Sequence, residues 1–110
     1  MTMYQRSVDL ACGLPFNIAS NALMLHIICQ TLTKQTGHIY TPDKLHLCLG
    51  DTHIYHQHLE GIACQIQRIP SDIPWLAFKN TYDNIENYKC EDIEVINYYP
   101  HPAIKFDMVA

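Results

Sequence analysis

Apolar and polar residues alternate through the first ten positions, MTMYQRSVDL, and this period of two predicts a strand that ends near Leu10. Gly13 and Pro15 follow, and Pro15 suits the first turn of a helix because its missing N–H is not needed there. The next segment, FNIASNALMLHIICQTLT, carries apolar residues around most of a helical circumference. It predicts a helix to about Thr33, and a helix that is apolar nearly all round is expected to be buried.

Four segments after this helix also have patterns that predict elements. Leucines alternate with other residues in KLHLCLG, which predicts a strand with one well-buried face. Apolar residues three and four apart then predict a helix from about His56 to Arg68. WLAFKN and EDIEVINYY predict two later strands, with a short helix or turn at DNIENYK between them. This order predicts an α/β (α+β) fold in which a mixed β-sheet packs against the long buried helix.

The length of the chain allows one domain at most. A chain of 110 residues, of which 48% are hydrophobic and 16% charged, has the composition of a folded globular protein. However, the first strand has no partner before it in the sequence, and the apolar helix needs cover on several sides. We therefore expect residues 1–110 to form a single, incomplete domain that either dimerises or is completed by residues upstream of Met1.

Charge and cysteine content bound the class of protein further. A net charge of −4 argues against nucleic-acid binding, which needs a basic face, so any phosphate must be held by a few residues. The five cysteines are never in a C-x-x-C pair and no apolar signal segment opens the chain, which predicts free thiols in the cytoplasm. The longest strongly apolar stretch, residues 22–29, is far shorter than the ~20 residues of a membrane span. No membrane partner is expected.

Several polar side chains near the apolar helix are candidates for binding a ligand. Arg6 and Ser7 combine a forked, permanent charge with a hydroxyl, a common pair for phosphate. Asn17 lies in the first turn of the helix, where its amide needs partners from nearby backbone or from a ligand. His53 and Tyr55 are two residues apart, so on an extended segment their side chains leave the same face and can bond one hydroxyl or carbonyl.

A group of histidines behind the second predicted strand offers possible zinc ligands: Asp51, His53, His56 and His58. Their spacing is poor for zinc, because His53 lies on the extended segment while His56 and His58 begin a helix and point in different directions. Surface or interface histidines, or a role for His53 in a polar site, fit the pattern better, and we predict no metal. From its residues alone the sequence indicates a nucleotide-like or anion-binding site.

Three stretches of the chain closely resemble consecutive signature stretches in the C-terminal half of thymidylate synthase. They are YQRSVDLACGLPFNIAS, LGDTHIYHQHLE and YYPHPAIK. Their order and approximate spacing match that family, and the resemblance covers nearly all of the chain. It implies the C-terminal part of the family's fold and its reaction, the reductive methylation of dUMP to dTMP. In that reaction 5,10-methylenetetrahydrofolate supplies both the carbon and the hydride, and the family works as a homodimer.

The resemblance implies roles in dUMP binding for five positions. Arg6 and Ser7 match the residues that hold the phosphate. Asn17 matches the asparagine whose amide recognises the O4 and N3 edge of uracil. Related enzymes that act on dCMP are similar to this family but have aspartate at this position. His53 and Tyr55 match the pair that bonds the 3′-hydroxyl of the deoxyribose.

Three further positions match the family's folate site. Asp9 corresponds to the aspartate that bonds the pterin ring, and Gly13 to a glycine that lets the ring approach the backbone. Ala110 ends a tail, IKFDMVA, that resembles the segment closing over bound ligands in the family.

The chain departs from the family's pattern at the reaction centre. The family's nucleophile is a cysteine in a Pro-Cys-His context that attacks C6 of the pyrimidine, and none of the five cysteines here follows a proline. Cys12, which is nearest to the site, stands where the family usually has an apolar residue. The family's N-terminal half, with its catalytic glutamate, has no counterpart in these residues. We therefore predict no catalytic residue in this chain.

Two hypotheses follow from these matches and departures. In the first, the chain is a C-terminal segment of thymidylate synthase that holds half of a methyltransferase site and associates as a homodimer or with a missing N-terminal half. In the second, it is a catalytically inactive pyrimidine-nucleotide-binding module or pseudoenzyme. An intact enzyme that uses one of the present thiols is a third possibility.

Overall fold

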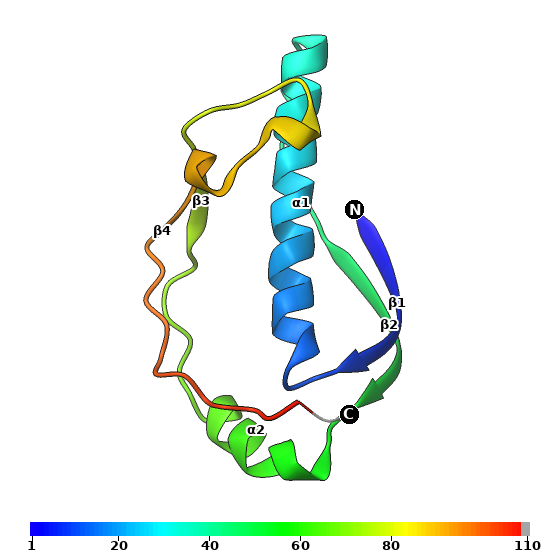
Figure 1. The fold of residues 1–110 in the computed structure, drawn as a ribbon, viewed down its shortest axis with the longest axis vertical. Coiled ribbons are helices and arrows are strands. Elements are labelled where there is room, and N and C mark those ends of the chain that lie inside the picture. The colour runs from blue at the N-terminus through cyan, green and yellow to red at the C-terminus, as the bar shows by residue number, and fades with distance from the viewer. Residues whose placement is uncertain (109–110) are drawn as a thin grey trace. The chain divides into compact units, whose positions relative to one another are not determined.

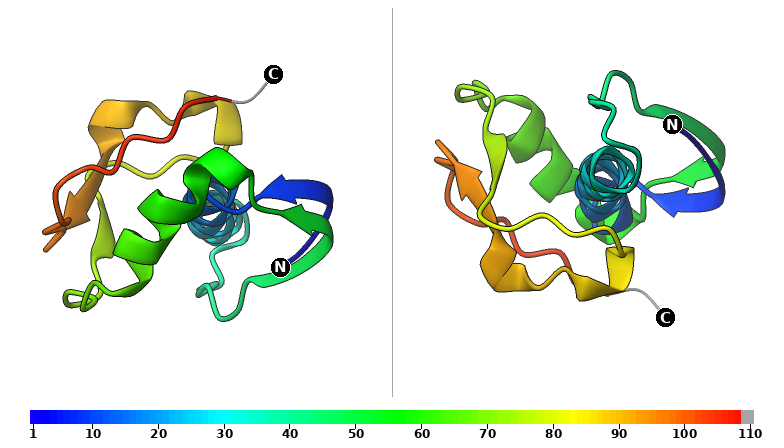
Figure 2. Two further views of the ribbon diagram at one scale, coloured as in Figure 1. Left: turned by 90° about the horizontal axis from the view of Figure 1, so that it is seen from below. Right: turned by 90° about the horizontal axis from the view of Figure 1, so that it is seen from above.

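A strand, a long helix and a second strand come first in the protein, whose computed structural model describes residues 1–108 (Figure 1). The strands β1 (Thr2–Asp9) and β2 (His46–His53) pair in parallel, with Thr2 opposite His46 and Asp9 opposite His53. They lie side by side in both views of Figure 2. The helix α1 (Gly13–Thr36) joins them, because a parallel pair needs a crossover connection.

Shorter elements follow β2. A 3₁₀ turn at His56–His58 leads into α2 (Leu59–Ile66), and β3 (Trp75–Phe78) pairs antiparallel with β4 (Ile93–Ile96). Two further 3₁₀ turns, Ile85–Asn87 and Cys90–Asp92, lie between β3 and β4. The predicted α/β class is confirmed. Within residues 1–108, the mixed sheet takes the form of two separate two-stranded sheets, one parallel and one antiparallel.

The chain divides into two compact units. Among the described residues, the first comprises 1–22, 45–70 and 101–108, and so holds β1, the start of α1, β2, α2 and the C-terminal tail. The second comprises residues 23–44 and 71–100, with the rest of α1, β3 and β4. All of the described residues that the sequence assigns to a ligand lie in the first unit.

The ends of α1 lie slightly outside the predicted ones. The helix begins at Gly13, two positions before Pro15, and continues three residues past Thr33 to Thr36. Gly37 stops it: its φ of +74° lies in the left-handed region, and its N–H donates to the Thr33 carbonyl at 3.0 Å. The end of the helix is therefore set by a glycine cap and not by the last apolar residue of the pattern.

The predicted burial of α1 is not confirmed. Of its 24 residues, only Cys29 and Thr31 are buried, and Phe16 is 77% exposed. Apolar side chains are spread around its circumference, and the described residues cover only part of it. Within residues 1–108, no helix is both long and apolar enough to cross a membrane.

Three predicted elements are shorter than their sequence patterns, and one of them, β3, already ends at Phe78. The helix predicted from His56 begins as a 3₁₀ turn, and α2 itself ends at Ile66. The last strand, β4, begins only at Ile93 because the three residues before it form a 3₁₀ turn. It ends at Ile96 because Asn97 adopts a left-handed backbone with φ 59°.

Asp92 ties together the loop between the strands of the second unit. It is 3% exposed, and its carboxylate accepts hydrogen bonds from Asn80 Nδ2 at 2.7 Å and from the Tyr82 hydroxyl at 3.2 Å. A third bond comes from the backbone N–H of Lys89 at 3.0 Å. These bonds, that of Asn80 first and that of Lys89 next, lower the pKa of Asp92 below the ordinary aspartate value.

We expect Asp92→Asn to lower the melting temperature at pH 7 by about 5 °C or more, because an amide cannot accept these three bonds as a carboxylate does. A lowered pKa stabilises the fold above the unfolded pKa of about 3.9, and this contribution disappears as pH falls through the folded pKa. Thermal denaturation followed by circular dichroism should therefore show a larger difference between wild type and variant at pH 7 than at pH 2. Asp72→Asn, at an exposed position, is the control. An equal difference at both pH values would contradict this role.

Candidate functional site

The parallel pairing of β1 and β2 brings Asp9 and His53 to the same edge of the sheet. They face each other in the register, and the N–H of Leu10 donates to the His53 carbonyl at 3.0 Å. Both residues end their strands, and the carboxyl ends of parallel strands lie at one edge, where loops carry ligand-binding groups. The edge formed by the ends of β1 and β2 is the centre of the candidate site.

The loop between β1 and α1 holds the Asp9 side chain in place. Its Oδ1 accepts hydrogen bonds from the backbone N–H groups of Ala11 at 2.9 Å and of Cys12 at 3.2 Å. These bonds close a turn of the kind that aspartate commonly forms with the backbone two and three residues ahead. Within residues 1–108 the second carboxylate oxygen, Oδ2, accepts no such hydrogen bond, so the turn fixes the orientation of the group without using all of its acceptor capacity.

Asp9, Gly13 and Asn17 converge on one cavity of about 540 Å³. A Cβ at Gly13 would lie 3.7 Å from Asn17 Nδ2 and 3.8 Å from the Asp9 Cβ, so the glycine lies directly between the two polar side chains. The opposite wall is formed by tail residues, including Phe106 and Met108. The structure therefore brings together three residues that the sequence assigns to folate or to the uracil ring.

The side-chain amide of Asn17 has no hydrogen bond to another residue within the described part of the chain, although the side chain is half-buried. Only its backbone carbonyl is used, accepting from Asn21 Nδ2 at 2.7 Å and from Ser20 Oγ at 3.3 Å. The alternative that the Asn17 amide hydrogen-bonds nearby backbone is therefore not observed. A half-buried amide at the wall of a cavity is available to a ligand.

His53 and Tyr55 lie side by side, as their spacing predicts. Tyr55 has an extended backbone, and the two rings meet edge to face with centroids 5.1 Å apart. Tyr55 also contacts the ring of His58, which in turn contacts Phe106 of the tail. A row of aromatic rings thus connects the end of β2 with the wall of the cavity.

Arg6 and Ser7 are not brought to the same face. They are consecutive residues of a strand, so their side chains leave opposite faces of the sheet, and Arg6 is exposed while Ser7 is half-buried. Arg6 lines a separate, shallower cavity with Gly50 of β2. A Cβ at Gly50 would lie 2.5 Å from the Arg6 carbonyl oxygen, so only glycine allows this close approach.

The histidines do not gather as zinc ligands. Among residues 1–108, His53 and His56 belong to no cluster of possible metal ligands, and His58 alone joins one, with Asp9 and Cys12. The sequence did not indicate this cluster, because the spacing of His58 relates it only to the nearby histidines, and Asp9 and Cys12 lie far from it along the chain. Ala110, assigned to folate by resemblance, lies outside the described residues.

The comparisons with known proteins agree in one family. The model of the thymidylate synthase family matches residues 1–110. The chain is 44% identical over 106 residues to the bifunctional dihydrofolate reductase-thymidylate synthase of Leishmania major, covering 96% of this chain and 19% of that protein. It is 42% identical over 105 residues to the thymidylate synthase of Mycoplasma mobile, covering 96% of this chain and 34% of that protein.

A parallel strand pair joined by a helix defines the class as an α/β protein, and a cavity lies at the carboxyl edge of the pair. The chain belongs to the thymidylate synthase family. It spans about a fifth to a third of the length of the curated relatives it matches.

Proposed function

We propose that this chain is the C-terminal segment of a thymidylate synthase domain and that it binds dUMP and 5,10-methylenetetrahydrofolate. The activity proposed for the whole protein is the reductive methylation of dUMP to dTMP, in which the folate supplies the carbon and the hydride. The observation that carries this proposal is the convergence of Asp9, Gly13 and Asn17 on one cavity, with the Asn17 amide unused by the protein.

The Asn17 amide has the polarity that uracil requires. Its NH₂ group can donate to O4 while its oxygen accepts from N3–H. Cytosine presents a donor in place of O4 and an acceptor in place of N3–H, so both bonds would be reversed. A half-buried amide therefore favours uracil and opposes cytosine.

The remaining dUMP contacts are assigned to β1 and β2. His53 and Tyr55 present an imidazole and a phenol together, which suits one hydroxyl such as the 3′-hydroxyl of the deoxyribose. Arg6 and Ser7 are proposed for the phosphate. Because they leave opposite faces of β1, the long Arg6 side chain must reach around the edge of the strand that is unpaired within residues 1–108 to meet a phosphate beside Ser7.

Folate is proposed to lie between Asp9 and the tail. The turn that holds Asp9 presents its free oxygen as an acceptor for N–H groups of a pterin ring, and Gly13 leaves room for that ring beside the backbone. Phe106 and Met108 on the opposite wall would cover the ring and exclude water.

The reaction needs groups that these 110 residues do not contain, because none of the five cysteines stands in a Pro-Cys-His sequence. We propose that the chain associates in the cytoplasm with an N-terminal half that supplies the nucleophile, or as a homodimer of a longer protein. Large apolar side chains such as Phe16, Ile66 and Trp75 are exposed, and such surface is usually covered by a partner.

The same cysteine observation favours a second candidate, an inactive pyrimidine-nucleotide-binding module or pseudoenzyme. Such a protein would keep the binding contacts of Asn17, His53 and Tyr55 and would have no use for a nucleophile. The two candidates differ in turnover and agree on dUMP binding.

Binding of dUMP tests the assignment of the phosphate site. In a fusion of this chain to the upstream segment of a complete thymidylate synthase, we expect Arg6→Ala to raise the Kd for dUMP by about tenfold or more, because it removes a charged hydrogen bond. Isothermal titration calorimetry measures this change. Lys34→Ala removes an exposed cation at the far end of α1 and serves as the matched control.

The unphosphorylated nucleoside deoxyuridine provides a second control. Its affinity should be the same for Arg6→Ala and wild type, since Arg6 has no phosphate to contact. An unchanged Kd for dUMP in Arg6→Ala, or an equal loss of affinity in Lys34→Ala, would show that Arg6 does not bind the phosphate.

A further inference from the structure

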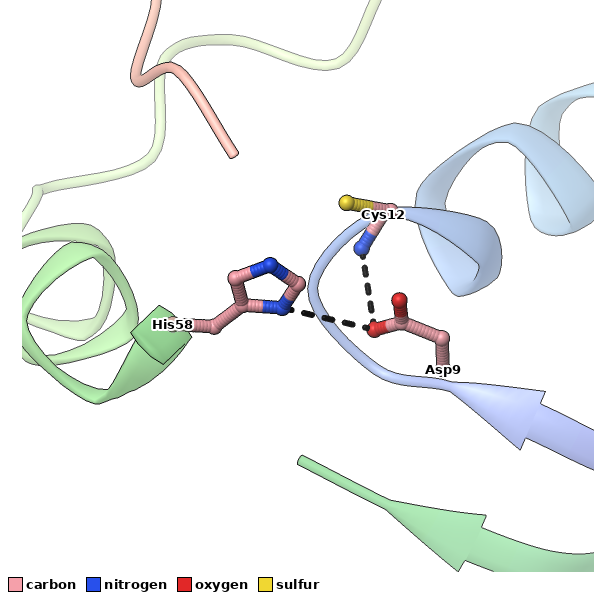
Figure 3. Close-up of side chains that lie close together, drawn as sticks. All are labelled: Asp9, Cys12 and His58. Carbon is pink, nitrogen blue, oxygen red and sulfur yellow. Dashed lines mark hydrogen bonds and ion pairs between the residues drawn. The ribbon is translucent and has the colours of Figure 1, made fainter. Parts of the chain in front are cut away.

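Asp9, Cys12 and His58 form a compact cluster of possible metal ligands within residues 1–108. A carboxylate oxygen, the Cys12 Sγ and a ring nitrogen of His58 all lie within 4.8 Å of one another (Figure 3). Asp9 and Cys12 are half-buried and His58 is buried. Asp9 ends β1, Cys12 lies in the following turn and His58 immediately precedes α2, so three separate elements contribute to the cluster.

A hydrogen bond from His58 to Asp107 determines which nitrogen of the His58 ring is protonated and which has a lone pair. Nε2 lies 2.8 Å from the backbone carbonyl oxygen of Asp107, and a carbonyl only accepts, so Nε2 carries a proton. In the neutral ring, Nδ1 then has a lone pair, and it is buried without a hydrogen-bond partner. It lies 3.9 Å from Asp9 Oδ1, which is too far for a hydrogen bond.

This arrangement is typical of a histidine prepared to bind a metal. Metal-bound histidines generally donate their second ring N–H to a carbonyl or carboxylate, which fixes the tautomer and aims the other nitrogen at the ion. His58 does this through Asp107, and its side chain is only 1% exposed. Its other nitrogen, Nδ1, lies beside a carboxylate and a thiol and has no hydrogen-bond partner among residues 1–108.

We propose that Asp9, Cys12 and His58 bind one zinc-class divalent cation, with its fourth coordination position open towards the cavity. Oxygen, sulfur and nitrogen ligands together select a borderline-soft ion such as Zn²⁺. Tetrahedral zinc would place these atoms about 3.3–3.6 Å apart. Since the three atoms lie within 4.8 Å of one another, the longest separation needs to close by at most about 1.2–1.5 Å.

Binding of the cation releases one proton. Cysteine binds zinc as the thiolate, so the thiol proton of Cys12 passes to solvent when the cation binds.

The proposed cation site shares one residue, Asp9, with the folate site of the proposed function. A cation on Asp9 and folate at Asp9 would exclude each other, so the cation would act as an inhibitor. Its binding does not depend on dUMP or folate, and an assay with metal alone can fail while the proposed function stands.

Cobalt titration of the full chain tests the proposal. Under anaerobic, reducing conditions, Co²⁺ should bind with one equivalent per chain and give a thiolate-to-cobalt charge-transfer band together with the visible bands of four-coordinate cobalt. Zn²⁺ should displace it. Cys12→Leu should abolish the charge-transfer band and weaken binding at least about tenfold, while Cys64→Ser, which removes an exposed thiol of α2, should leave both unchanged.

His58→Gln provides the second variant, and circular dichroism shows whether each variant is folded. Weak binding by a folded His58→Gln chain supports the proposal. A wild-type chain without a saturable charge-transfer band, or equal losses in Cys12→Leu and Cys64→Ser, would overturn it.

Discussion

Replacement of Asn17 by aspartate in an assembled enzyme is expected to shift the ratio of kcat/KM for dUMP over dCMP towards dCMP by about a hundredfold or more. A carboxylate cannot donate to O4 of uracil, so the variant leaves O4 without its donor and places a negative charge beside it. The amino group of cytosine, in contrast, can donate to the carboxylate. Polar groups left unpaired in a ligand site account for discrimination of this size.

The structure also predicts that this variant folds. The Asn17 amide makes no hydrogen bond with another described residue, so the substitution disturbs no protein contact of that group. Gln30→Glu makes the same change from amide to carboxylate more than three helical turns further along α1, and is the matched control. Steady-state rates with both nucleotides give the ratio. If Asn17→Asp leaves the ratio unchanged, or Gln30→Glu shifts it equally, Asn17 does not recognise the base.

Local patterns place the neighbouring residues of the candidate site, while their assignment to ligands comes from the family resemblance. Asp9 ends a strand with period-two alternation, and Gly13 and Asn17 lie four apart at the start of a helix. The shared face of His53 and Tyr55 follows from their spacing on an extended segment. The same alternation places Arg6 and Ser7 on opposite faces of β1, which two consecutive residues of a strand cannot avoid.

Contacts between distant residues could not be predicted in this way. His58 bonds the carbonyl of Asp107, 49 residues further along the chain, and no periodicity of either segment encodes that contact. The packing of Gly61 in α2 against the ring of Phe106 is likewise a tertiary contact. The start of β4 depends on the Asp92 side chain, because a capped turn replaces the residues that the apolar pattern assigns to the strand.

The second large effect concerns the nucleophile. The chain on its own is expected to show no turnover of dUMP, because attack at C6 needs a thiolate and Cys12, the cysteine at the cavity, is poorly suited to the role. Burial and the charge of Asp9 raise the pKa of its thiol, which lowers the fraction of thiolate at neutral pH. Joined to an upstream segment that carries a Pro-Cys-His sequence, the same 110 residues are expected to turn over dUMP.

Release of tritium from [5-³H]dUMP in the presence of 5,10-methylenetetrahydrofolate is the most direct measurement of this account. We predict no release above background from the 110-residue chain and ready release from the fusion to the upstream segment, with loss of that release when the cysteine of its Pro-Cys-His sequence is changed to serine. A fusion that binds dUMP without releasing tritium would favour the inactive nucleotide-binding module. Release by the 110-residue chain at an ordinary enzymatic rate would contradict the account.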